Sequence, residues 1–153
     1  MDQVVLLCVD GSEHAIGAAA TGLARLAPGG RTIVVTVVEG GNPTLVSGVS
    51  GMAGGALSPE QLQELNEVRS EEGEAVVQAA VAALDQPGLE TQVLLGEPGV
   101  ELMLFAEEVE ATVVVVGSRG HGAIKRALLG SVSDHLVRHA PCPVLVVRDE
   151  VED

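Results

Sequence analysis

Five short segments of strand length divide the chain, and four of them are continuous apolar runs of the kind that form strands buried on both faces. They lie at residues 4–9, 33–38, 89–95, 112–116 and 143–147. Longer segments with the apolar spacing of helices separate these runs. Strands that alternate with helices in this way predict an α/β protein. Right-handed crossovers then build one Rossmann-like, doubly wound, five-stranded parallel sheet with helices on both faces.

Three of the expected helices are short, and a cap residue marks the start of the first. Ser12 is a good N-cap for a helix over residues 13–27, which the following Pro-Gly-Gly ends. Two shorter helices are expected over residues 98–108 and 131–139.

A longer helix is marked by a capping box. Ser58 is its N-cap, Pro59 fits the first helical position and Gln61 closes the box. The helix is expected to run to about Asp85. Its expected core positions are Leu62, Leu65, Val68, Val76, Ala79, Ala80 and Ala83.

The length and composition predict one domain. A chain of 153 residues with 46% hydrophobic residues builds a core of its own. The domain is expected to span residues 1–148, followed by an acidic tail over 149–153. Residues 40–57 are rich in glycine and long for a connector, which predicts a flexible lid or an interaction loop. A merely tolerated surface insertion fits the same composition.

The sequence predicts a cytoplasmic protein. The start, Met1-Asp2-Gln3, lacks the basic region of a signal peptide, and each apolar run is too short to span a bilayer. Cys8 and Cys142 lie inside apolar segments without metal-ligand spacing, as buried thiols do in a reducing compartment.

A glycine-rich stretch, Gly117–Ser131, lies between the fourth predicted strand and the last helix. Backbone amides at such a junction hold phosphates. The stretch lacks the Gly-Lys-Ser/Thr end of a P-loop, and its order, Gly-x-x-Gly-x-Gly after the fourth strand, differs from the dinucleotide fingerprint. The site is therefore expected to bind an anionic small ligand by another pattern.

Charge supports that expectation. The whole chain carries a net charge of −14, yet residues 117–148 hold five basic residues against one acid, a local charge of +4. Ordinary solvated surface charges are the alternative explanation for Arg119 and Lys125. The overall acidity and the single aromatic residue argue against binding to nucleic acid.

The spacing of the glycine-rich stretch resembles the ATP-binding branch of the universal stress protein family. The pattern is Gly117-x-x-Gly120, then nine residues, then Gly130-Ser131. The resemblance extends through residues 131–133 and 139–147, and residues 9–12 near the start also match. It therefore covers almost the whole chain.

This resemblance implies a fold, a ligand and an assembly. The fold would be that of the adenine nucleotide alpha hydrolases, with strand order 3-2-1-4-5. The ligand would be ATP with Mg²⁺ or Mn²⁺ on its phosphates, and its occupancy would report stress or energy state to a partner. The assembly would be a homodimer, in which the apolar edge strand Val144–Val147 pairs with its copy.

The expected nucleotide site gathers at the carboxyl ends of the strands. Its residues are Asp10, Gly11, Ser12, Val37, Val38, Gly117, Arg119, Gly120, His121, Gly122, Gly130, Ser131, Val132 and Ser133.

The site residues have distinct expected roles. The glycines let the backbone approach the ligand, and the start of the last helix offers amides and the hydroxyls of Ser131 and Ser133 to phosphate. By the resemblance, Asp10 contacts the adenosine end and the backbone near Val37 reads the adenine edge. A turn role for Asp10, an N-cap role for Ser131 and a solvent-facing His121 are the alternatives.

We expect a binding protein with no catalytic residue and no protein-held metal. A slow ATP hydrolase is one alternative, although no general base or paired carboxylate is evident near the loop. A stress-response scaffold that acts through partners without nucleotide is the other.

Overall fold

The computed structural model describes residues 2–39, 57–119 and 129–148. The elements in chain order are β1 (Val4–Cys8), α1 (Glu13–Arg25), β2 (Arg31–Val38), α3 (Pro59–Leu84), β3 (Glu90–Leu95), α4 (Pro98–Glu108), β4 (Val113–Gly117), α5 (Ser131–His139) and β5 (Val144–Val147).

The five strands form one sheet in which every pairing is parallel, in the order β3-β2-β1-β4-β5. The predicted fold and strand order are therefore confirmed. β1 lies at the centre, where Leu6 is opposite Ile33 of β2 and Val114 of β4.

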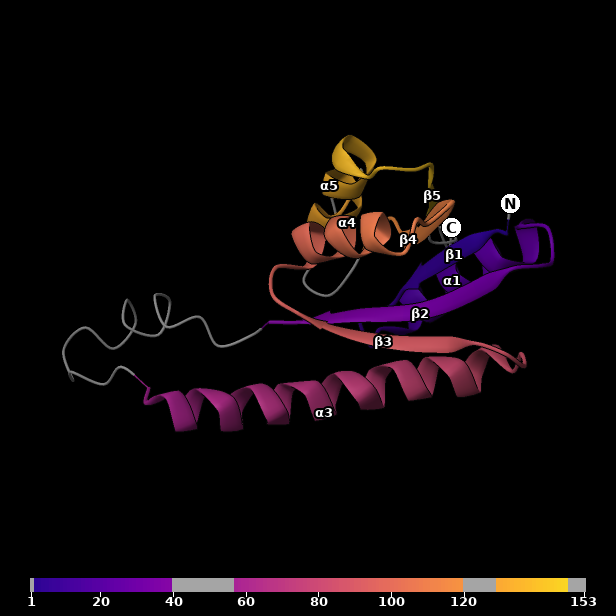
Figure 1. The fold of residues 1–153 in the computed structure, drawn as a ribbon. Helices are drawn as coiled ribbons and strands as arrows, with labels where there is room; N and C mark the ends of the chain where they lie inside the picture. Colours follow the sequence, from indigo (N-terminus) through magenta and orange to yellow (C-terminus); the bar gives the residue numbers. More distant parts are fainter. Residues whose placement is uncertain (1, 40–56, 120–128, 149–153) are drawn as a thin grey trace, which may run out of the picture.

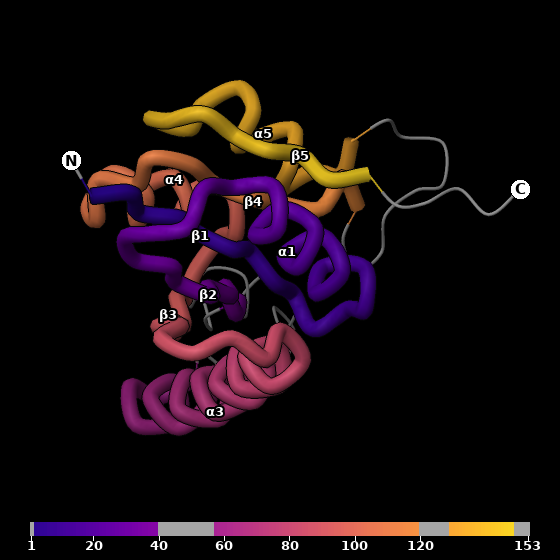
Figure 2. The backbone as a smooth tube through the Cα atoms, turned by 90° about the vertical axis from the view of Figure 1, so that its right-hand side faces the viewer, coloured from indigo at the N-terminus to yellow at the C-terminus, as the bar shows by residue number. Residues whose placement is uncertain are grey.

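Helices cover both faces of the sheet, as Figures 1 and 2 show. Successive side chains of a strand point to opposite faces, so β1 contributes side chains to the hydrophobic core on each face of the sheet. Leu6 and Cys8 pack in the core below α4 and α5, which includes Phe105. Val5 and Leu7 pack in the core below α1 and α3.

The two edge strands differ in character. β3 exposes Glu90 and Gln92, and the Glu90 carboxylate accepts two hydrogen bonds of 2.9 Å from Arg31 on β2. β5 is apolar at all four positions, and each residue is half-buried. The expectation of strands buried on both faces thus holds for β1 and β4, whereas the edges are only partly covered.

The long helix α3 departs from the predicted core positions in both halves. Its buried residues are Gly73, Val77 and Ala80. The expected core residues Leu62 and Leu65 are half-buried, Val68 is 51% exposed, Val76 is half-buried, and Ala79 and Ala83 are exposed.

The length of the helix explains the departure in its first half. Its 26 residues extend about 39 Å, whereas the six residues of β3 extend about 20 Å. The first half of α3 therefore runs past the end of β3, as Figure 1 shows.

Three predicted features fall outside the described residues. They are the glycine-rich loop over 40–57 apart from its last residue, the acidic tail 149–153, and Gly120, His121 and Gly122 of the predicted site. Among the residues that are described, no helix is both long and apolar enough to cross a membrane.

Candidate functional site

The carboxyl ends of β1 and β4 lie side by side at the centre of the sheet, because the strand order places β1 between β2 and β4. The chain leaves β1 toward β2 and leaves β4 toward β5, so the connections diverge at this point. Ligands of doubly wound sheets bind in the crevice that this divergence opens. Asp10 follows β1 here, and Ser118 follows β4.

The turn after β1 is held by the Asp10 carboxylate. Its Oδ1 accepts hydrogen bonds from the Ser12 backbone N–H (2.9 Å) and from the Ser12 hydroxyl (2.6 Å). Gly11 between them has a φ of 90°, in the left-handed region that favours glycine. The Ser12 Oγ accepts in turn from the Ala15 N–H (3.1 Å) and caps α1. Asp10 thus has the turn role, and a nucleotide contact by this residue stays a prediction.

The backbone of Val37 faces the crevice. The Val35 carbonyl accepts from the Val9 N–H on the β1 side (2.9 Å), whereas the Val38 carbonyl accepts from the Gly96 N–H on the β3 side (3.0 Å). Backbone groups of alternate strand residues point to the same side, so the N–H and C=O of Val37 point toward β1. The pairing of β1 with β2 has already ended at Cys8 and Val35.

Gly117 ends β4, opposite Val147 of β5. A Cβ atom at this position would lie 3.4 Å from the Ala18 Cβ and 3.4 Å from the Arg119 carbonyl oxygen, which is ordinary contact. The packing of the described residues therefore does not itself demand glycine at 117. Close approach of a ligand to the backbone is the explanation that the predicted site offers.

The two ends of the glycine-rich stretch are tied together by Ser118, Gly130 and Ser133. The Gly130 N–H donates to the Ser118 carbonyl (2.6 Å). The Ser133 hydroxyl lies between the Ser118 carbonyl (3.2 Å) and the Gly130 carbonyl (3.0 Å) and donates to them. Ser133 is 1% exposed, so its hydroxyl proton is committed to this closure. Its contribution to the site is therefore to position the backbone.

The start of α5 offers amides without a side-chain cap. Gly130 is the N-cap, with φ −70° and ψ 166°, and in the described part of the chain no side-chain cap hydrogen bond is made to the first turn. α1 and α3, in contrast, are capped by Ser12 and Ser58. α4 also lacks a side-chain cap, but it begins with Pro98, which has no N–H. The first-turn amides of α5, together with the exposed Ser131 hydroxyl, are suited to an anion.

The structure brings most of the described site residues to one edge of the sheet. Asp10, Gly11 and Ser12 follow β1, Val37 and Val38 end β2, Gly117 and Arg119 end or follow β4, and Gly130 to Ser133 open α5. Sequence reasoning missed Ser118, which is buried and anchors the loop through its backbone. A backbone acceptor leaves no mark in the sequence.

Cys8, next to this edge, is not a reactive group. Burial, with a smaller contribution from Cys142, raises the pKa of the Cys8 thiol to about 12. Within residues 2–39, 57–119 and 129–148, no three or more His, Cys, Asp or Glu side chains gather where they could hold a metal ion.

The model of the universal stress protein family matches residues 1–148. A universal stress protein of Thermus aquaticus, encoded in the 3′ region of a QAH/OAS sulfhydrylase, is 36% identical and covers 97% of this chain and all of its own. The universal stress protein YxiE of Bacillus subtilis is 30% identical and covers 94% of this chain and 97% of its own.

Solved structures share the fold. The protein MJ0577 superimposes with a TM-score of 0.75 at 23% identity, over 98% of both chains. A universal stress protein of Archaeoglobus fulgidus in complex with dAMP has a TM-score of 0.55 at 23% identity, over 95% of this chain and 97% of its own. A family protein of Arabidopsis thaliana with AMP bound has a TM-score of 0.58 at 18% identity, over 97% and 93%.

Proposed function

The chain belongs to the universal stress protein family, and from this premise we propose that it binds ATP as a sensor of stress or energy state. The observation that carries the proposal is the uncapped start of α5, tied to the end of β4 beside Asp10 and Val37. Family structures in complex with dAMP and with AMP support an adenine nucleotide at such a site.

Each half of the crevice suits one end of the nucleotide. The first-turn amides of α5 and the Ser131 hydroxyl donate to phosphate oxygens, and Arg119 adds positive charge at the end of β4. The N–H and C=O of Val37 pair with the adenine edge, while Asp10 accepts from the adenosine end. Because the core is aliphatic, the base packs on aliphatic surface rather than on an aromatic ring.

We propose that Mg²⁺ or Mn²⁺ enters with the nucleotide, held through its phosphates. Hard divalent cations of this kind are commonly bound by substrate phosphates together with few protein ligands. The ion would offset phosphate charge, and the chain's own residues would bind and orient the nucleotide.

Calorimetric titration of the purified protein with ATP tests the proposal. We expect saturable binding, and we expect Gly130→Val to abolish it because a branched side chain at the N-cap obstructs the approach to the α5 amides. Failure of the wild type to bind at millimolar ATP, or an unchanged affinity in Gly130→Val, would refute the nucleotide site. Mass spectrometry of nucleotide released from protein purified without added ligand identifies the natural occupant.

We further propose that the chain is a binding protein rather than an ATP hydrolase. Asp10, the carboxylate at the crevice, holds its own turn through hydrogen bonds from Ser12. Incubation with ATP and Mg²⁺ tests this view: turnover faster than about one event per minute would contradict it, since working enzymes turn over at about 1 s⁻¹ or more.

We propose a homodimer that forms through β5, in the cytoplasm, where the two free cysteines stay reduced. Val144–Val147 is an apolar edge strand, half-buried within one protomer. Antiparallel pairing with a second copy would cover it, whereas the opposite edge, β3, carries exposed Glu90 and Gln92. Light scattering tests the proposal, and a monomer at micromolar concentration would contradict it.

A further inference from the structure

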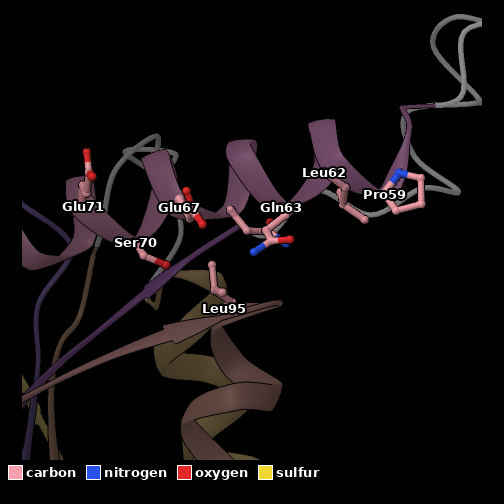
Figure 3. Close-up of a pocket in the computed structure, with 8 residues that line it drawn as sticks. Pro59, Leu62, Gln63, Glu67, Ser70, Glu71 and Leu95 are labelled. Atoms are coloured by element: carbon pink, nitrogen blue, oxygen red, sulfur yellow. The ribbon is translucent and has the colours of Figure 1, made fainter.

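A groove of about 640 Å³ lies between the first half of α3 and the end of β3 (Figure 3). Leu62 and Leu95 supply its apolar surface, and Leu95 is 40% exposed. In Figure 3, Gln63 and Ser70 point toward Leu95, whereas the Glu71 carboxylate points away from it. The groove therefore combines an apolar floor with a polar rim.

The groove exists because the sheet ends before the helix does. β3 stops at Leu95, and among the described residues no strand packs against the part of α3 beyond it. Leu62 and Leu65 are only half-buried there, and Val68 is 51% exposed. Exposed apolar surface with a polar rim is typical of an interaction site.

The rim is strongly acidic. Residues 59–72 carry five glutamates against Arg69, a net charge of −4, and the glutamates are Glu60, Glu64, Glu67, Glu71 and Glu72. In the part of the chain that the structure describes, none of the five forms an ion pair. Their negative field is therefore available to an external cation.

We propose that this groove docks a basic amphipathic helix of a partner protein. Apolar side chains on one face of that helix would contact Leu62 and Leu95, and its lysines or arginines would lie opposite Glu67 and Glu71. Pro59 to Glu71 extends about 18 Å, which matches three turns of a docked helix. The groove shares no lining residue with the predicted nucleotide site, although Leu95 pairs with Val38, and the proposal does not depend on ATP binding.

Charge favours a basic partner helix over two other occupants of the groove, a second copy of this chain and residues 40–56. A second copy would bring the same charge of −4 to the groove, and like charges across an interface are unfavourable. Residues 40–56, which precede α3, contain no lysine or arginine and therefore cannot neutralise the rim.

Fluorescence anisotropy with a designed peptide tests the proposal. The probe is a fluorescein-labelled 14-residue helix with leucines on one face and lysines elsewhere, and a glutamate version serves as its charge control. Leu95→Glu removes apolar surface, and Leu104→Glu on α4 is its matched control, since Leu104 is 48% exposed outside the groove. Glu67→Lys/Glu71→Lys changes the net charge of residues 59–72 from −4 to zero.

The matched charge control is Glu107→Lys/Glu108→Lys, which changes the net charge equally on exposed positions of α4. We expect the wild type to bind the lysine peptide with micromolar affinity. The affinity should fall by at least about tenfold in both groove variants, since tenfold is the cost of one well-placed contact, and should change by no more than about twofold in both control variants. Circular dichroism establishes that each variant is folded.

Several results would overturn the proposal. They are absent binding to the wild type at millimolar peptide, equal weakening by groove and control variants, and equal binding of the glutamate peptide. A groove occupied by this protein itself would also overturn it. Sedimentation that changes in Leu95→Glu would reveal a second copy, and a tenfold affinity gain after replacing residues 40–56 with a Gly-Ser linker would reveal that segment.

Discussion

Replacing Ser133 with alanine tests how the glycine-rich stretch is held closed. The substitution removes one buried hydroxyl, whose partners are the carbonyls of Ser118 (3.2 Å) and Gly130 (3.0 Å). Both carbonyls keep another donor: the Gly130 N–H for Ser118 (2.6 Å) and the Asp134 N–H for Gly130 (2.9 Å). No buried acceptor is left unpaired, so the loss of unfolding free energy should be about 1 kcal/mol, the net value of one hydrogen bond.

Urea denaturation followed by circular dichroism measures this loss. With an m-value of about 2 kcal/mol/M, the midpoint of Ser133→Ala should fall by about 0.5 M. Ser131→Ala, two residues away and exposed, is the matched control and should leave the midpoint nearly unchanged.

Binding of ATP separates positioning from direct contact. Because the α5 amides remain in Ser133→Ala, the variant should still bind ATP, more weakly than the wild type and far better than Gly130→Val. An unchanged midpoint in Ser133→Ala, or an equal shift in Ser131→Ala, would refute the argument that the buried hydroxyl closes the loop.

Three further predictions concern packing and thiol chemistry. Gly17→Ala on the open face of α1 should raise the unfolding free energy by about 0.5–1 kcal/mol. Gly22→Ala should lower it by about 1–3 kcal/mol, because the new Cβ would overlap the buried Val115 Cγ1. Urea midpoints that shift in the same direction for both variants would contradict this prediction. Because burial raises the pKa of Cys8 from about 9 to about 12, its stabilising effect should be complete below pH 9 and decline as pH rises from 9 to 12. At pH 8 a thiol reagent should modify half-buried Cys142 first and Cys8 only on unfolding, and equal rates in the folded protein would be inconsistent with the burial of Cys8.

The sequence predicted the parallel sheet and its apolar edge strand β5, because short apolar runs such as that in β1 have few alternatives to a buried strand. It placed the end of β4 one residue early, since Gly117 reads as a loop residue although it pairs with Val147. The helical spacing of Leu62, Leu65 and Val68 indicated a buried face, but spacing cannot reveal how far the neighbouring strand extends.

The candidate site likewise has features that the sequence predicts and features that it does not. Glycine spacing and strand ends could be read from the residues, so Gly117 and Gly130 were placed at the crevice in advance. The closure by Ser133 could not be read, because its partners are backbone carbonyls, one of them 15 residues away in the chain. Local hydrogen bonds such as the Ser12 cap could be predicted from the sequence, because they depend only on neighbouring residues in the chain.

The central position of β1 has a consequence during synthesis on the ribosome. β1 leaves the ribosome first, yet Val5 pairs with Val113, which is made 108 residues later. At about 5–20 residues per second, one flank of β1 waits about 5–20 s for its partner. Throughout that interval an apolar strand has one open edge, so newly made chains should depend on chaperones more than the finished protein does.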